Sequence, residues 1–273
     1  MRKILKEAKR IVIKVGTSTL TYENGKINLT RMEHLARRVA DLINNDKQVI
    51  LVTSGAVGVG MGKLNLSKKP TAITEKQAVA SVGQCELMHI YSKLFSEYGI
   101  IVGQILLTRT ITENEVTKNN AINTFNSLLE KHVLPIVNEN DAISTDELVS
   151  FDKFSFGDND TLSSIVAALT NSELLILLSD VDGFYDGDPR KDEEAKVIKV
   201  VEKIDDKMMN FVGKSSSKMG TGGMMTKLTA AKMATENHIE VVLANGDDMN
   251  NLQKITEGED VGTWFRKGEK DVY

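Results

Sequence analysis

Six short runs of apolar residues, rich in valine and isoleucine, recur along this chain and constrain its fold more than any other feature. Each run is almost continuously apolar, which is typical of strands buried on both faces of a parallel sheet. Longer amphipathic stretches separate the runs, so the pattern is one of repeated strand–helix units. The expected strands are 11–15, 48–52, 100–107, 133–137, 174–178 and 240–244.

The stretch between the first two runs shows the helical pattern most clearly. Met32, Leu35 and Val39 recur at helical spacing, and Thr30 with Glu33 matches a capping box. Further helices are expected at about 74–97, 118–131, 160–171 and 223–237. We therefore predict a three-layer α/β/α sandwich around a mainly parallel central sheet.

Composition limits the class of protein and of partner. The 273 residues are 41% hydrophobic and 26% charged, the profile of an ordinary globular protein. A formal net charge of -4 gives no basic field for nucleic acid, so a small-molecule ligand is expected. The single cysteine, Cys85, is expected to be a small buried residue. Without a signal-peptide core or an apolar run near 18 residues, we expect a cytoplasmic protein with no membrane partner.

Polar segments follow five of the six expected strands. They read GTST, TSGAVGVGMG, NENDAIST, SDVDG and NGDD in chain order. Ligands bind outside the carboxyl ends of the strands in an open α/β sheet, so these segments converge on the edge where a site is expected. Gly, Asn, Asp and Ser also serve ordinary turns, but five such segments together favour a ligand site.

A glycine-rich segment after the second strand suggests anion binding. Residues 54–63, SGAVGVGMGK, match neither the Walker P-loop nor the GxGxxG fingerprint. Small residues after a strand nevertheless let backbone amides approach an anion closely. The glycines at 58–62 could equally serve tight helix packing, whereas Ser54 and Gly55 at the strand end favour the site.

A second glycine-rich loop precedes the helix expected at 223–237. Thr226 and Lys227 are expected in the first turn of that helix. A lysine there opposes the helix dipole, and bound phosphate would reverse the sign of that interaction. The alternative is a flexible connector with a solvated lysine.

Lys14 interrupts the first apolar run and needs an anionic partner, because an unpaired ammonium costs several kcal/mol to bury. The segment FGDNDTLSS, 156–164, offers Asp158 and Asp160 just before a helix. One of them could be an N-cap. Since both cannot serve the same cap, the other is available to orient a lysine or to bind an ammonium group.

Taken together, these motifs resemble the amino acid kinase family. In that family's order they are VIKVGTSTL, VTSGAVGVG, VGQILLT, VLPIVNENDAI, FGDNDTLS, SDVDGFYDGDPR, GTGGMMTK and VGTWF, which span almost the whole chain. Within the family, the resemblance is to members that phosphorylate L-glutamate. It implies a carbamate kinase-like fold in one domain, 1–273, and ATP-dependent phosphorylation of the glutamate side-chain carboxylate to L-glutamyl 5-phosphate, the first step of proline biosynthesis. Mg²⁺ would accompany the ATP.

The resemblance also implies roles for individual residues. Lys14 and Lys227 would flank the phosphoryl group in flight, and Asp160 would hold the two lysines. The substrate carboxylate is already ionised near neutral pH, so no general base is required. The implied substrate contacts are Ser54, Asp141 and Asn159, with Asp158 and Asn138 as weaker candidates. The implied ATP contacts are Lys14, Gly16, Ser179, Asp180, Thr221, Gly222, Gly223, Met224, Met225, Thr226 and Lys227, and no metal ligand is assigned.

Two departures from the family pattern bear on regulation. The segment DELVSFDKFS, 146–155, is longer than in some relatives and borders the region linked to proline feedback, so proline is expected as an inhibitor. Many relatives carry a C-terminal PUA domain, and because the chain ends soon after Trp264 and Phe265 none is expected here. The resemblance further implies a homo-oligomer and functional coupling to glutamyl phosphate reductase.

Other acceptors remain open, because shared phosphate chemistry does not fix the acceptor. They are N-acetylglutamate, aspartate, carbamate, a nucleoside monophosphate and an isoprenoid phosphate. The joint presence of NENDA and GDND favours glutamate. A non-catalytic nucleotide-binding sensor would be expected to lack Lys14, Lys227 or Asp160, and all three are present.

Overall fold

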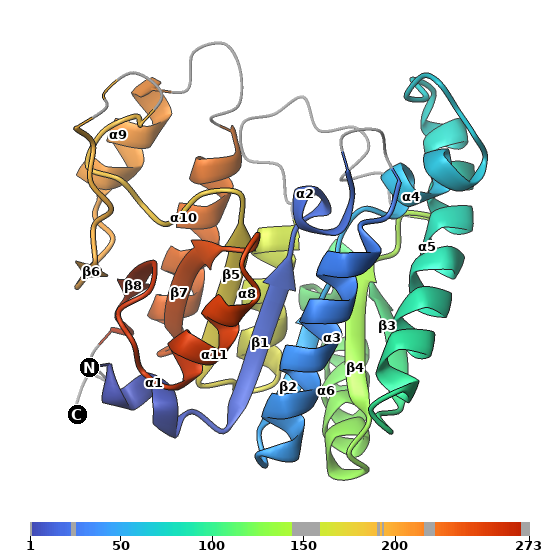
Figure 1. Ribbon diagram of the computed structural model, residues 1–273, viewed down its shortest axis with the longest axis horizontal. Coiled ribbons are helices and arrows are strands. Elements are labelled where there is room, and N and C mark those ends of the chain that lie inside the picture. Colours follow the sequence, from blue (N-terminus) through green and yellow to red (C-terminus); the bar gives the residue numbers. More distant parts are fainter. Residues whose placement is uncertain are drawn as a thin grey trace.

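A mixed sheet of eight strands forms the centre of the computed structural model, which describes residues 2–22, 26–143, 159–189, 192, 194–215 and 222–268 (Figure 1). The strand order is β3-β4-β2-β1-β5-β7-β8-β6, and the neighbours are parallel except for β7 and β8. The strands are β1 (Arg10–Val15), β2 (Gln48–Val52), β3 (Val102–Leu107), β4 (Leu134–Glu139), β5 (Leu174–Ser179), β6 (Val200–Val201), β7 (Glu240–Asn245) and β8 (Thr263–Phe265).

Helices cover both faces of this sheet and bury two separate apolar clusters (Figure 1). One face carries α1 (Lys3–Glu7), α3 (Leu29–Asn44), α4 (Ala56–Lys63), α5 (Ile73–Ser96) and α11 (Asn250–Thr256). The other face carries α6 (Glu115–Glu130), α8 (Asn159–Leu169), α9 (Asp206–Ser215) and α10 (Gly222–Glu236). Two short helices, α2 (Thr17–Leu20) and a 3-10 turn (Arg109–Thr112), complete the described set. The predicted three-layer α/β/α sandwich is confirmed.

All six predicted strands are present, with ends that differ from the predicted ones by at most two residues. Two strands, β6 and β8, were not predicted, because two or three residues are too few to show a periodic pattern. The predicted capping box of Thr30 and Glu33 is wrong. The cap of α3 is Asn28, whose side chain accepts a hydrogen bond from the Arg31 backbone N–H.

The strand order fixes where a ligand can bind. β1 lies between β2 and β5, with Lys14 paired to Val52 on one side and to Leu177 on the other. The chain builds one half of the sheet from β1 to β4 and the other from β5 onward, so β1 and β5 form the topological switch point. Their carboxyl ends lie at the upper edge of the sheet in Figure 1.

Helices α4 and α5 pack unusually closely. A Cβ placed on Gly83 would lie 1.8 Å from the Ala56 carbonyl oxygen, and one on Gly60 would lie 2.0 Å from that of Val79. Only glycine permits this approach, so tight packing, the alternative considered for the segment 54–63, is right for Gly60. None of the helices in the described ranges is long and apolar enough to cross a membrane.

Candidate active site

Asp160 brings together two lysines from distant parts of the chain. Its Oδ1 lies 2.6 Å from Nζ of Lys14, and its Oδ2 lies 3.2 Å from Nζ of Lys227. The Thr226 hydroxyl donates a third contact to Oδ2 at 3.1 Å. The carboxylate is fully buried and the side chain of Lys14 is only 6% exposed. Asp160 is therefore the partner that a lysine within an apolar strand requires.

The charge state of this group follows from two opposing effects. Burial alone raises the pKa of Asp160, but the charges of Lys14 and Lys227, together with their hydrogen bonds, outweigh it. The net result is a pKa below the usual value for an aspartate. Asp160 is therefore ionised near neutral pH, and two ammonium groups share one carboxylate. The cluster retains a net positive charge with which to attract an anion.

Lys227 lies elsewhere on its helix than the sequence suggested. Because α10 begins at Gly222, Lys227 falls in the second turn, and the expected unfavourable position in the first turn is wrong. From there Nζ donates to the Gly223 carbonyl oxygen at 3.1 Å as well as reaching Asp160. Asp160 itself lies in the first turn of α8, where the helix dipole favours a carboxylate.

A central cavity of about 230 Å³ opens over this cluster, at the switch point between β1 and β5. Ser54 and Asn159 meet on its wall, where the Asn159 amide donates to the Ser54 hydroxyl at 2.9 Å. Its lining residues are Lys14, Gly16, Thr17, Ser18, Ser54, Asn159, Leu178, Ser179, Asp180 and Lys227. Residues from β1, β5, α8 and α10 thus meet here with Ser54, which lies just beyond β2. No described residue of NENDAIST or NGDD, the segments also expected at this edge, lines the central cavity.

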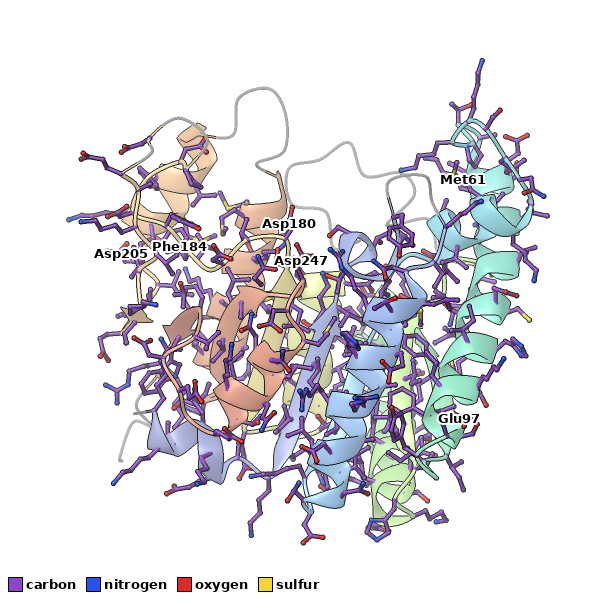
Figure 2. The ribbon with its side chains drawn as sticks, in the orientation of Figure 1. Met61, Glu97, Asp180, Phe184, Asp205 and Asp247 are labelled. Atoms are coloured by element: carbon purple, nitrogen blue, oxygen red, sulfur yellow. The ribbon has the colours of Figure 1, made fainter. Side chains whose placement is uncertain are left out.

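An apolar cavity of about 420 Å³ adjoins the central cavity, because Ser179, Asp180 and Lys227 line both. Its walls include Val181, Phe184, Phe211, Val212 and Met224. Figure 2 shows Asp180 at the carboxyl edge of the sheet, with Phe184 toward the side of α9. The pair of cavities offers an apolar chamber joined to a cationic one, a division that suits a base and its phosphates.

A third cavity of about 380 Å³ lies between α5 and the ends of β3 and β4, and we call it the α5 cavity. Asp141 lines the α5 cavity and not the central one. Asn138, at the end of β4, is 1% exposed, and its amide donates to Gln84 Oε1 on α5 at 2.8 Å. Gln84 and Cys85 also line this cavity and were not predicted as site residues. Cys85 is exposed, so its predicted buried role is wrong.

The remaining predicted residues fall into two groups. Asp158 and Thr221, like the long segment 146–155, lie outside the described residues. Gly222 begins α10, and Gly223 and Met224 line the apolar cavity. Met225 instead packs against the apolar cluster under α10, so it lines neither of the two joined cavities.

The acidic and histidine side chains that the structure describes do not form a metal site. Across the described ranges, no group of three or more His, Cys, Asp or Glu side chains is placed to hold a metal ion. Mg²⁺ usually takes one or two carboxylates at most and otherwise binds phosphate oxygens and water. The donor set here is therefore compatible with Mg²⁺ that arrives on a nucleotide.

Comparison with known families places this geometry in context. The family model described as the amino acid kinase family matches residues 9–245. The chain belongs to the amino acid kinase family. The matched region contains every charged residue of the Lys14–Asp160–Lys227 cluster and all the lining residues of the three cavities.

Three similar proteins carry the same name. The chain is 58% identical to "Glutamate 5-kinase" of Clostridium perfringens, covering 98% of this chain and 100% of that protein. It is 52% identical to that of Clostridium tetani, over 97% of each chain. It is 50% identical to that of Listeria monocytogenes serotype 4b, over 100% of this chain and 98% of the relative.

Solved structures share the fold at low identity. A UMP kinase from Bacillus anthracis matches with a TM-score of 0.63 at 16% identity, covering 96% of this chain and 97% of its own. An isopentenyl phosphate kinase matches with a TM-score of 0.64 at 17% identity, covering 94% and 99%. These two structures support the fold alone.

Proposed function

We propose that this protein transfers the γ-phosphoryl group of ATP to the side-chain carboxylate of L-glutamate, giving L-glutamyl 5-phosphate, the first step of proline biosynthesis. The observation that carries the proposal is the placement of Asp160 between Lys14, which lines the central cavity, and Lys227, which lines both the central and the apolar cavity. Relatives named glutamate 5-kinase, 50–58% identical over nearly the full chain, support glutamate over the other acceptors.

ATP occupies the two joined cavities in this proposal. The adenosine lies in the apolar cavity against Phe184 and Met224, and Ser179 and Asp180 lie where the two cavities join. The phosphates then extend toward Lys227 and into the central cavity. The other predicted ATP contacts, Gly16, Gly222, Gly223 and Thr226, lie along this route or at the start of α10, whose N–H groups favour an anion.

Transfer depends on electrostatics more than on covalent chemistry. Charge spreads over the phosphoryl oxygens in the transition state, and Lys14 and Lys227 approach that charge from two elements. Asp160 fixes both ammonium groups before substrate arrives, so little reorganisation is needed. Mg²⁺ supplies further charge neutralisation when it is bound to the nucleotide. The glutamate carboxylate is the nucleophile and needs no base, because it is ionised near neutral pH.

Five side chains are proposed to hold glutamate. Ser54 and Asn159 lie beside Lys14 in the central cavity, where their hydroxyl and amide can orient the reacting carboxylate. Asp141 and Asn138, at the end of β4, suit the α-ammonium end of the substrate. Asp158 is retained as a weaker candidate from the sequence alone.

Trapping the product as a hydroxamate tests this function. Purified protein is incubated with ATP, Mg²⁺ and hydroxylamine, with glutamate, N-acetylglutamate, aspartate or no acceptor. We expect hydroxamate with glutamate alone, because hydroxylamine captures an acyl phosphate. A signal only with another acceptor, or none with any carboxylate while ATP still binds, would overturn the proposal.

The product and the family suggest how the reaction is connected in the cell. We propose that residues 1–273 act as one kinase domain in the cytoplasm, as a homo-oligomer. An acyl phosphate hydrolyses readily, so functional coupling to a glutamyl phosphate reductase would limit its loss. Proline, the end product of such a route, is proposed as the feedback inhibitor.

A further inference from the structure

Gln84, near the middle of α5, forms an amide pair with Asn138 that is incompletely satisfied. Gln84 is 8% exposed and Asn138 is 1% exposed, and one hydrogen bond of 2.8 Å joins them. The Gln84 Nε2 and the Asn138 Oδ1 are buried and have no hydrogen-bond partner among the described residues. One amide NH₂ group and one amide oxygen of the pair therefore lack a hydrogen-bond partner in the described ranges.

This conclusion does not depend on how the two amides are oriented. If both side chains are flipped, Gln84 donates to Asn138, and the pair then leaves the Asn138 nitrogen and the Gln84 oxygen over. Either arrangement leaves one donor and one acceptor of the same residue pair without a partner within the described part of the chain. Buried polar groups without partners cost free energy, so the pair is expected to meet a ligand that offers both an acceptor and a donor.

The surroundings of the pair restrict the chemistry of that ligand. Gln84 lines the α5 cavity together with Asp141 and Glu139, which are each 7% exposed. A carboxylate alone would pair with the amide donor but leave the amide acceptor unused, whereas an ammonium alone would pair with the acceptor but leave the donor unused. A zwitterion that carries an ammonium and a carboxylate on one carbon satisfies both conditions.

The Gln84–Asn138 pair lies near the proposed reacting centre at Ser54 and Lys14. Strands β2 and β4 are neighbours with Val52 opposite Val137, so Asn138, the second-last residue of β4, lies close along the sheet edge to Ser54, which comes just after β2. A short chain with its head group at Gln84 can therefore extend a carboxylate toward Ser54 and Lys14. This matches an α-amino acid whose side chain ends in a carboxylate.

We propose that Gln84 is a specificity-determining residue that, with Asn138, binds the α-amino acid head group of the substrate in the α5 cavity. This inference rests on the proposed function and deepens it. Gln84 does not approach the phosphoryl group, so its effect is on substrate binding and not on the chemical step. The site selects a free zwitterionic head group over an acylated one, because acylation removes the ammonium charge.

Kinetics of Gln84→Leu provide the first test. We expect the KM for glutamate to rise about tenfold or more, with kcat within about threefold and the KM for ATP unchanged. Gln253→Leu is the matched control, because Gln253 lies on α11, away from the α5 cavity, and contacts Arg38 and Glu257. An unchanged glutamate KM in a folded Gln84→Leu protein would overturn the inference.

Cys85 provides a second readout that does not depend on turnover. It is the single cysteine of the chain, it is exposed, and it lines the same cavity. We expect glutamate to slow alkylation of Cys85 in the wild-type protein. The glutamate concentration that gives half-maximal protection should be about tenfold higher in Gln84→Leu. A non-hydrolysable ATP analogue alone should not slow alkylation. Alkylation at an unchanged rate in saturating glutamate would show that the head group binds elsewhere.

A second variant guards against a folding defect. Gln84→Glu keeps the side-chain length and an acceptor for Asn138, but it removes the donor and places a negative charge beside the substrate carboxylate. We expect a larger rise in glutamate KM than for Gln84→Leu. If wild-type protein forms no hydroxamate with glutamate, the proposed function fails. If it does and both Gln84 variants keep the wild-type KM, only this inference fails.

Discussion

The two lysines that share Asp160 should matter for the transition state more than for binding. Because charge on the phosphoryl oxygens spreads during transfer, we expect Lys14→Ala and Lys227→Ala each to lower kcat by about 10²–10³-fold. The KM for glutamate should change far less. Steady-state kinetics with Lys232→Ala as control test this, since Lys232 lies on α10 but pairs loosely with Asp206 at 3.7 Å. If both site variants kept the wild-type kcat, neither lysine would stabilise the transition state.

Asp160 should make stability depend on pH. Its pKa is lowered in the folded protein, so its stabilising effect is fully present above the unfolded pKa of about 3.9. The effect is lost as the pH falls through the lower folded value. We expect Asp160→Asn to reduce the free energy of unfolding by about 3–5 kcal/mol at pH 7, because Lys14 loses its partner.

Urea unfolding at several pH values measures this difference. The gap in free energy of unfolding between wild type and Asp160→Asn should begin to narrow below about pH 4, where the carboxyl of the unfolded wild type binds a proton, and should narrow further as the pH falls through the lower folded pKa. A gap of constant size across that range would mean that the charge of Asp160 contributes little to stability.

The residues of the candidate site differ in how well the sequence alone predicts that they belong to it. Lys14 was predictable because an ammonium in an apolar strand requires an anion, and Asp160 was one of two candidate partners, with Asp158, because both carboxylates lie at the start of a predicted helix. Gln84 was not predictable. It lies within a helix of 24 residues and follows no strand, and only the tertiary structure shows that its amide is buried against Asn138.

At the scale of elements, the contact between α4 and α5 is the most sensitive to added volume. We expect Gly83→Ala to reduce the free energy of unfolding by about 1–3 kcal/mol or more, because the new Cβ would lie 1.8 Å from the Ala56 carbonyl oxygen. Since α4 follows Ser54, the displacement should also raise the KM for glutamate. Thermal unfolding and steady-state kinetics measure the two effects.

Gly58→Ala is the matched control for stability. A Cβ at Gly58 meets nothing closer than Thr17 Cγ2 at 3.7 Å, so alanine fits without strain. Alanine also has the higher helix propensity, and we expect no loss of stability or a gain of about 0.5–1 kcal/mol. Equal destabilisation by both substitutions would contradict the role assigned to the close contact.

Strands and helices were predictable where a pattern runs long enough. The six apolar runs become β1, β2, β3, β4, β5 and β7 because burial on both faces requires continuous apolar sequence. β8 instead pairs through its backbone with β7 and β6, which leaves no local signature. The start of α10 was predicted one residue late, and Lys227 was therefore assigned to the first turn of the helix although it lies in the second.

At the scale of the whole molecule, Arg2 joins the beginning of the chain to the segment before β8. Its guanidinium donates to the backbone oxygens of Val261, Lys199 and Gly262 and pairs with Asp260 at 2.5 Å. We expect Arg2→Met to reduce the free energy of unfolding by about 2–3 kcal/mol, because these acceptors lose a charged donor.

Chemical denaturation of Arg2→Met beside Lys3→Met checks this. Lys3 is the exposed neighbour of the 6% exposed Arg2, so the same substitution there removes a charge without removing a buried contact. Similar midpoints for the two variants would mean that the Arg2 contacts do not hold the end of the sheet.

The separation of Lys14 from Asp160 along the chain also affects biosynthesis. Lys14 leaves the ribosome before its counter-ion Asp160, and the stretch between them is more than half of the 273 residues. At about 5–20 residues per second, that interval lasts roughly 7–30 s. During this interval the nascent β1 carries an ammonium group without its counter-ion, and this opposes burial of the strand. Its apolar residues are therefore less prone to pack early against a non-native segment.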